Sequence, residues 1–274
     1  MTRRILGVLL AAGFLVVGFG LLVTALVRQR ADADKETVKR NLMELGQFAA
    51  RYHEAEAGKK KLPEIAVVPP ATVLPSKFPP DERLSWAVAM LPFLDQKRQK
   101  TDGLIKLIDP NLAWNDGGNA EAAKTRLRVL LCPAAPPEFR DDEPVVTQIV
   151  GIAGVGADAA ALPFDSPLAG SFRYDGATPL GAFPDGTSNT LLFGETNREL
   201  GPWIRGGPST VRGLDRDLPV IGTNAQFGGI HIGGAWFGFA DGGARFLNER
   251  IEPRVLFALA TRAGGPDEAI AIAE

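Results

Sequence analysis

The chain of 274 residues has very few of the side chains that build metal centres and disulfide frameworks. It contains one cysteine and two histidines, whereas a structural zinc site needs about four such ligands. A single thiol cannot form an intramolecular disulfide, so a head outside the cytoplasm would be stabilised by packing alone. This scarcity argues against a histidine- or thiolate-rich metal centre and leaves the compartment open.

The chain also lacks an excess of positive charge. Its 30 Lys and Arg against 32 Asp and Glu give a formal net charge of −2 and a pI near 5.8, so no general attraction for a phosphate backbone is expected. It contains no G-x-S-x-G motif and no complete dinucleotide-binding or P-loop motif. We therefore expect no nucleic-acid partner, no cofactor and no enzymatic activity.

Charge is absent from one long stretch near the N-terminus. Residues Ile5 to Val27 are 23 consecutive residues without a charged side chain, and such a helix covers roughly 30 Å, the thickness of a bilayer core. A cleaved signal peptide has an apolar core of only about 7–15 residues and a small-residue cleavage site, whereas this run ends in Arg28-Gln29-Arg30. After a flank of residues 1–4, we predict a retained transmembrane helix at 5–27 with the lipid bilayer as its partner; a removed signal is the alternative.

Basic residues flank both ends of the predicted span. Two lie before it and five follow it closely: Arg3 and Arg4, then Arg28, Arg30, Lys35, Lys39 and Arg40. The positive-inside rule counts basic residues near the ends of a span, and this count would place the rest of the chain in the cytoplasm. Charge alone therefore leaves the topology ambiguous.

The span continues into a predicted amphipathic neck helix at 28–57. Apolar residues recur there at three- and four-residue steps, at Val38, Leu42, Leu45, Ala49 and Tyr52, which places them on one helical face. The helix should end near Gly58. Residues 58–83 form a proline-rich arm, because six prolines between 62 and 83 favour an extended segment over packed secondary structure.

The remaining residues, 84–274, are predicted to form a globular head. Its helices are expected within 84–96, after a cap at Asn119, and from Pro253 toward Gly264-Gly265. Strands are expected from short apolar runs separated by turn residues, namely VLLC at 129–132, VVTQIVGIAGV at 145–155, TLLFGE at 190–195 and AWFGFADGGARFL at 235–247. The second half is therefore mainly strands and loops.

The segment DGTSNT at 185–190 is one candidate site. Asp185 and Asn189 are oxygen donors that suit calcium, but the segment lacks the order of an EF-hand loop. With Gly186 between them, they equally predict a turn that leads into the strand ending at Glu195. We favour the turn, and we expect Glu195 to be buried and hydrogen-bonded to turn backbone or to an arginine.

His231 is a second candidate. It could form a metal or acid–base pair with Asp241, but the intervening strand should hold the two side chains at opposite ends. Asp241-Gly242-Gly243 instead predicts a tight hairpin turn. A catalytic pair of His231 with Cys132 is conceivable by composition, yet Cys132 closes an apolar run and is expected to be buried.

The order of several blocks resembles a bacterial family of prepilin-like proteins, the domain of unknown function 1559. These are RNLMELGQFAARYHEA at 40–55, LSWAVAMLPFLDQ at 84–96, the Cys132-Pro133 step, DGTSNTLLFGE at 185–195, the H-x9-D-G motif from His231 to Asp241-Gly242, and RVLFALATRAGG at 254–265. The blocks cover nearly the whole chain in the family's order, which makes the resemblance specific.

The resemblance implies a pilin-like α+β architecture, in which one long N-terminal helix is anchor and neck and a β-rich head faces outward. It implies kinship with type IV pilins and pseudopilins, and no established activity. The prepilin cleavage site with its glutamate is missing, because Gly13-Phe14 is followed by Leu15-Val16-Val17-Gly18. The resemblance also implies a cysteine before the N-L-x-x-L-G block, at the position that matches Val38 here.

We therefore expect a single-pass protein of the inner membrane with an extracytoplasmic head and a structural or interaction role. Its partners would be envelope proteins of the pilus or secretion type. The alternative is a membrane-tethered hydrolase or a carbohydrate- or ligand-binding module, with its site in the head loops around DGTSNT and His231.

Overall fold

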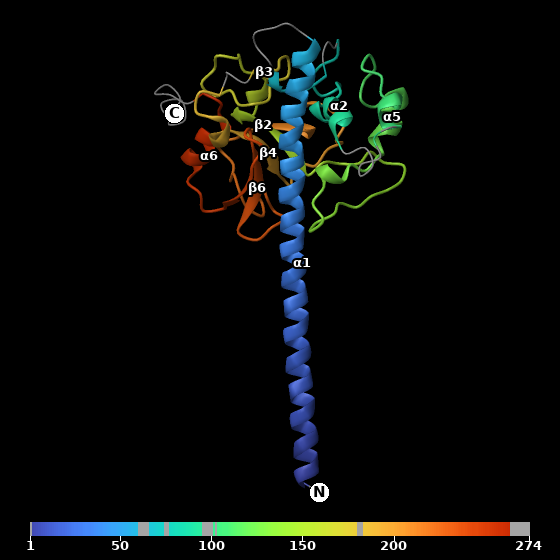
Figure 1. Cartoon of the computed structure of the whole chain (residues 1–274), viewed down its shortest axis with the longest axis vertical. Coiled ribbons are helices and arrows are strands. Elements are labelled where there is room, and N and C mark those ends of the chain that lie inside the picture. The colour runs from blue at the N-terminus through green and yellow to red at the C-terminus, as the bar shows by residue number, and fades with distance from the viewer. Residues whose placement is uncertain are drawn as a thin grey trace.

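The N-terminal helix runs without a break through most of the length of the molecule. The computed structural model describes residues 2–59, 66–73, 77–94, 101, 103–179 and 183–263, with side chains of the first helix described at 15, 17–48 and 52. This helix, α1 (Thr2–Lys59), has 58 residues, or about 87 Å at 1.5 Å per residue. Its C-terminal part lies in the head and its N-terminal part projects away (Figure 1). The predicted continuity of 5–27 with the neck is confirmed.

One apolar face holds α1 in the head. Val38, Leu42 and Leu45 are fully buried, as their spacing predicts. Tyr52 is half-buried and packs against Phe48 and Phe93. The side chain of the predicted face residue Ala49 lies outside the described residues.

A mixed five-stranded sheet forms the centre of the head. Its strand order is β5-β2-β4-β6-β7, with β2 and β5 parallel and the other neighbours antiparallel. The strands are β2 (Ile149–Val155), β4 (Leu191–Glu195), β5 (Val211–Leu214), β6 (Gly234–Phe239) and β7 (Ala244–Asn248). A separate pair joins β1 (Ala66–Val68) to β3 (Thr178–Pro179). The predicted strands in 145–155, 190–195 and 235–247 are confirmed, and β5 is a strand that the sequence pattern did not indicate.

Helices cover both faces of this sheet. Along β2, Ile149 and Ala153 join the apolar cluster that includes α1, whereas Val150 and Ile152 join the cluster beneath α6 (Pro253–Ala260). A strand covered on both faces needs apolar side chains at successive positions, which explains the unbroken run in β2. The layers can be followed in Figure 1. The predicted pilin-like α+β architecture is confirmed.

Short helices fill the space around the sheet. They are α2 (Trp86–Met90), η1 (Leu91–Phe93), α4 (Leu104–Leu107), α5 (Gly117–Ala123), η2 (Arg128–Leu130), η3 (Ala159–Ala161), η5 (Thr187–Asn189) and η6 (Gly207–Ser209). The Ser85 hydroxyl accepts a hydrogen bond from the Ala87 amide and caps α2. The predicted helices after Ser85 and from Pro253 are confirmed, and the latter ends at Ala260.

Two predictions near the middle of the chain are wrong. Asn119 does not cap a helix: α5 begins after Asp116, and the buried Asn119 amide binds the backbone of the loop before it, at Asp109, Leu112 and Ala113. The run 129–132 is not a strand, because η2 occupies 128–130. Val129, Leu130 and Cys132 are buried by packing, and the Asn41 amide of α1 donates to the carbonyls of Arg128 and Leu131.

The proline-rich stretch is more ordered than its composition suggests. Within its described part, Ala66–Val68 is a strand, and Ala71 and Thr72 are fully buried. The Ala71 amide donates to the Arg173 carbonyl and the Val73 amide to that of Leu84. These hydrogen bonds to the head satisfy backbone amide groups of the segment between its prolines. The prediction of an arm without packed secondary structure is therefore wrong for 66–73, while 60–65 and 74–76 lie outside the described residues.

Candidate functional site

Three residues from separate sequence blocks meet in the interior of the head. Cys132 follows η2, Glu195 ends β4, and His231 precedes β6. The His231 Nε2 atom lies 3.6 Å from the Cys132 Sγ atom and 3.7 Å from the Glu195 Oε2 atom. All three residues are at most 9% exposed. We call this group the Cys–Glu–His cluster.

Burial keeps the cluster uncharged at neutral pH. Desolvation raises the pKa of Glu195 to about 8, with a smaller opposing effect of the Trp236 backbone amide. Desolvation, followed by the charge of Lys35, lowers the pKa of His231. Burial, followed by the charge of Glu195, raises the pKa of the Cys132 thiol to about 12. A neutral carboxylic acid, imidazole and thiol therefore lie side by side near pH 7.

This arrangement does not suit nucleophilic catalysis. An activated thiol is a thiolate at neutral pH, oriented by a base whose other nitrogen is held by a third group. Here the thiol holds its proton, and the thiol and the carboxyl group both face the same imidazole nitrogen. In the part of the chain that the structure describes, no group of three or more His, Cys, Asp or Glu side chains is arranged to hold a metal ion.

The Cys–Glu–His cluster instead connects loops to the sheet. The Gln148 side chain accepts from the Cys132 amide and donates to the Ala135 carbonyl, at 2.8 and 2.7 Å. The charges of Asp34 and Lys35 on α1 act on His231, so the cluster lies near the point where α1 enters the head. The cluster thus lies where the loops after η2 and before β6 meet the end of β4, close to the neck.

The Asp241 end of the H-x9-D-G motif is a hairpin turn. His231 precedes β6 and Asp241 follows it, so the strand separates them as predicted. The Asp241 Oδ1 atom accepts from the Gly243 amide at 2.8 Å, and Gly242 has a φ of 82°, a left-handed conformation that favours glycine. The turn prediction for Asp241-Gly242-Gly243 is confirmed.

The candidate oxygen donors at 185–190 also form a turn. The Asn189 side-chain amide donates to the Asp185 carbonyl at 2.9 Å, and the Asn189 backbone amide donates to the Gly186 carbonyl. Gly186 has a φ of 89° and precedes η5. Asp185 and Asn189 are exposed, and their geometry is that of a side-chain-stabilised turn leading into β4.

A family model described as "Protein of unknown function (DUF1559)" matches residues 39–217, which is more than half of the chain. The chain belongs to the DUF1559 family. No curated protein and no solved structure matches it. The family expected from the sequence blocks is thereby confirmed, and the matched region contains Cys132 and Glu195 but ends before His231.

The sequence of this DUF1559 protein raises a pair of His231 with Cys132, and the structure places these two side chains side by side; the sequence does not indicate that Glu195 joins them. The predicted burial of Glu195 is confirmed. Its predicted partner is turn backbone or an arginine, whereas the titratable side chain beside it in the structure is His231. A buried acid at a strand end and a histidine in a glycine-rich loop are each ordinary. Only the antiparallel pairing of β4 with β6 brings the two side chains together.

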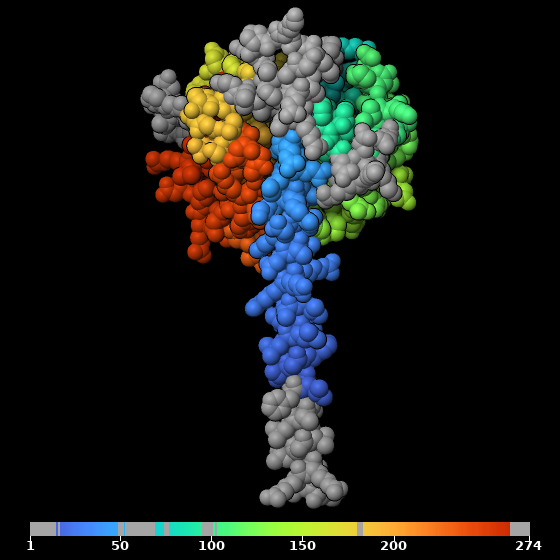
Figure 2. Space-filling model, in the orientation of Figure 1, coloured from blue at the N-terminus to red at the C-terminus, as the bar shows by residue number. Residues whose placement is uncertain are grey.

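A second feature is an exposed apolar surface on α1. From 15 to 27 the described large apolar side chains are 42–74% exposed, at Leu15, Val17, Phe19, Leu21, Leu22, Val23, Leu26 and Val27. Figure 2 shows this part of the helix bare of the head. Among the described residues, no helix meets the length and hydropathy needed to cross a membrane, and much of the predicted span 5–27 falls on side chains outside that set.

Proposed function

We propose that this DUF1559 protein is a membrane-anchored, pseudopilin-like component of the bacterial cell envelope with a structural or interaction role. The observation that carries the proposal is the exposed apolar surface between Leu15 and Val27 on a helix whose other end is packed in the head. The anchor would be residues 5–27, in the inner membrane.

Exposure of this apolar surface to water is energetically unfavourable. Burying one large aliphatic or aromatic side chain stabilises by about 1.5–3 kcal/mol, and eight such side chains are exposed on this part of α1. Together they favour an apolar environment by on the order of 10 kcal/mol. A bilayer supplies that environment along a helix, and Arg28 and Arg30 would lie at its boundary.

The head supports a non-catalytic role. The buried Cys–Glu–His cluster of the head is neutral near pH 7 and lacks the geometry of an activated nucleophile. An outward-facing head follows from kinship with pilins and pseudopilins. In this view the head presents a surface to other envelope proteins, and α1 holds it at a fixed height above the bilayer.

Alkaline extraction of membranes that contain the full chain tests the anchor. An integral protein stays in the membrane pellet at pH 11 and is released by detergent. Recovery of the full-length chain in the alkaline supernatant would contradict the proposal. High pH weakens the electrostatic contacts that hold peripheral proteins on a membrane, but it does not extract a helix that spans the bilayer.

A further inference from the structure

A cleft with a mixed polar and apolar lining opens on the head, and none of the residues of the Cys–Glu–His cluster line it. Its volume is about 680 Å³, within the range of about 300–1,000 Å³ typical of small-molecule sites. Its walls come from the end of the proline-rich stretch, from Tyr174 and from the chain between 199 and 212. The lining residues that bear on its chemistry are Asp81, Tyr174, Glu199, Arg205, Ser209 and Arg212.

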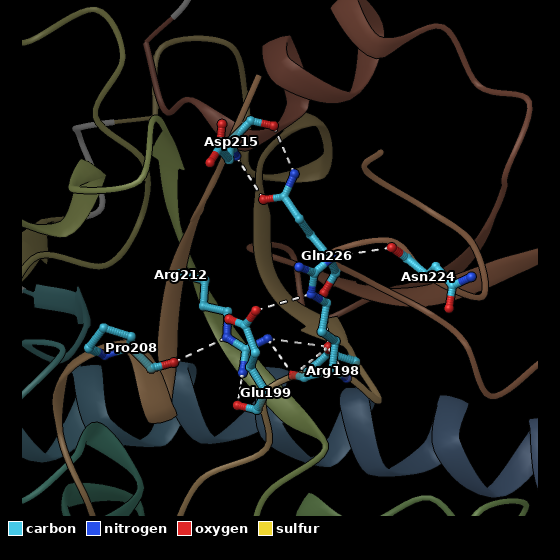
Figure 3. Close-up of polar contacts among 8 residues, drawn as sticks. Arg198, Glu199, Pro208, Arg212, Asp215, Asn224 and Gln226 are labelled. Atoms are coloured by element: carbon cyan, nitrogen blue, oxygen red, sulfur yellow. Dashed lines mark hydrogen bonds and ion pairs between the residues drawn. The ribbon is translucent and has the colours of Figure 1, made fainter. Parts of the chain in front are cut away.

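The wall at Glu199 is held in a strained conformation. Glu199 has a φ of 51° and is the non-glycine residue with positive φ among those described. Such a conformation costs roughly 1–2 kcal/mol for an ordinary residue and persists where surrounding contacts impose it. Here the contacts come from Arg212, whose guanidinium donates to the carbonyls of Arg198, Glu199 and Pro208 (Figure 3).

The charges on the cleft wall are balanced and already engaged. The Arg205 guanidinium pairs with Asp81 at 3.5 Å, and the Glu199 carboxylate pairs with the neighbouring Arg198 at 3.1 Å. Two carboxylates and two guanidiniums line the cleft, so their formal charges cancel. An anion would face the carboxylates and a cation the guanidiniums, and either would have to displace an existing partner.

Two hydroxyl groups on the wall are unengaged. Among the described residues, no hydrogen bond is made by the side chain of Tyr174 or of Ser209, although both line the cleft. The Tyr174 ring adds a flat apolar surface, and prolines 80, 202 and 208 stiffen the rim. The cleft thus offers hydroxyl donors, carboxylate acceptors, an aromatic face and no net charge.

We propose that this cleft binds a neutral oligosaccharide. The many hydroxyl groups of such a ligand both donate and accept hydrogen bonds, so they match the free hydroxyls of Tyr174 and Ser209 and the outer oxygens of Asp81 and Glu199. The C–H face of a sugar ring packs on the Tyr174 ring. This site differs from the loops at 185–190 and 231, and it does not depend on the anchor.

Titration calorimetry on the full chain in lauryldimethylamine oxide, a detergent without sugar, tests the proposal. The probes are cellotetraose, maltotetraose and chitotetraose, with tetragalacturonate as a charged oligosaccharide of the same length. We expect submillimolar binding of at least one neutral probe and at least tenfold weaker binding of tetragalacturonate. Binding of none of the neutral probes, or preference for tetragalacturonate, overturns the proposal.

Variants locate the site. Tyr174→Phe and Ser209→Ala each remove one hydroxyl and should each weaken binding about fivefold, as expected for one hydrogen bond. The matched controls are Tyr52→Phe, the other tyrosine of the chain, and Ser188→Ala in the exposed turn at 185–190; both should stay within twofold. Equal loss in a control and its partner, or no loss in either cleft variant, overturns the location. Unchanged thermal unfolding of each variant shows that the fold is retained.

Discussion

Glu195 is completely buried, and the His231 imidazole beside it is neutral near pH 7. Its side chain is 0% exposed, and the effect of the Trp236 backbone amide on its pKa is smaller than that of desolvation. An ionised carboxylate there would be strongly disfavoured, so the residue remains protonated to about pH 8. A buried acid of this kind makes stability depend on pH in the direction opposite to that of a salt-bridged carboxylate.

Replacing Glu195 by Gln should remove that dependence. The folded-state pKa of about 8 exceeds the ordinary value of 4.5, so the folded state retains a proton that the unfolded chain releases between these values. The free energy of unfolding of the native protein should therefore fall across pH 4.5–8, by up to about 1.4 kcal/mol per pH unit, relative to Glu195→Gln. Denaturant titrations at pH 4.5, 6 and 8 measure the difference.

In that comparison the lowered pKa of His231 acts on both proteins, and it opposes the effect by weakening stability as the pH falls below 6.5. A difference between native protein and Glu195→Gln that stays constant from pH 4.5 to 8 would contradict the assignment of Glu195 as a neutral buried acid.

Cys132 should be unreactive in the folded protein. It is 1% exposed and burial raises its pKa to about 12, while alkylating reagents attack the exposed thiolate. At pH 8, labelling by iodoacetamide should be at least 100-fold slower than in the urea-unfolded chain, as followed by mass spectrometry. Labelling of the native chain at the unfolded rate would mean that the thiol is accessible and activated.

At the scale of elements, α1 and the β6–β7 hairpin approach through two glycines. A Cβ atom added at Gly46 would lie 2.6 Å from the Cα atom of Gly242. Neither backbone can yield easily, because Gly46 is inside a helix and Gly242 is inside the hairpin turn with a φ of 82°. This close packing sets where the hairpin lies on the neck.

Gly46→Ala should therefore destabilise the head by about 1–3 kcal/mol, the usual cost of overpacking. Gly20→Ala is the matched control, because it lies on the same helix and a Cβ atom there meets nothing within 4 Å. Alanine should favour the helix at Gly20 by up to about 1 kcal/mol. Thermal unfolding of both variants tests this, and equal transition temperatures would show that the Gly46–Gly242 contact is not close in solution.

Local sequence patterns predict the individual helices, strands and turns better than they predict the tertiary contacts between them. The spacing of Val38, Leu42 and Leu45 sufficed for the buried neck face, and Asp241-Gly242 sufficed for the hairpin, because both depend on neighbours in the sequence. The strand predicted at 129–132 is wrong because the apolar side chains there are buried by packing on a helix distant in the sequence, and not by pairing in a β-sheet. The Cys–Glu–His cluster and the cleft each join segments far apart in the chain, so no local pattern contains them.

At the scale of the whole molecule, the two halves of α1 have different surroundings. Residues 38–48 present buried side chains to the head, whereas the large side chains described between 15 and 27 are exposed. The helix is continuous across both parts. The head is thus joined rigidly to a surface that water does not favour.

Two arginines in the exposed apolar part should prevent stable insertion. Phe19→Arg with Leu22→Arg places two charges in the C-terminal half of the predicted span, at up to about 2.5–3.5 kcal/mol each on insertion scales. Most of the chain should then leave the membrane fraction. Met43→Arg with Gln47→Arg adds the same charge at exposed neck positions of α1 and should leave fractionation unchanged. Equal fractionation of the two double variants would contradict the anchor.

The most direct test of the central claim is protease treatment of intact spheroplasts that express the full chain, with the products identified by mass spectrometry. We predict that external protease cleaves the head while a peptide containing residues 5–27 stays in the membrane, which is the result for an anchored protein whose head faces outward. A head that is protected until the spheroplasts are lysed, or a chain recovered without any membrane-retained peptide, would contradict the account.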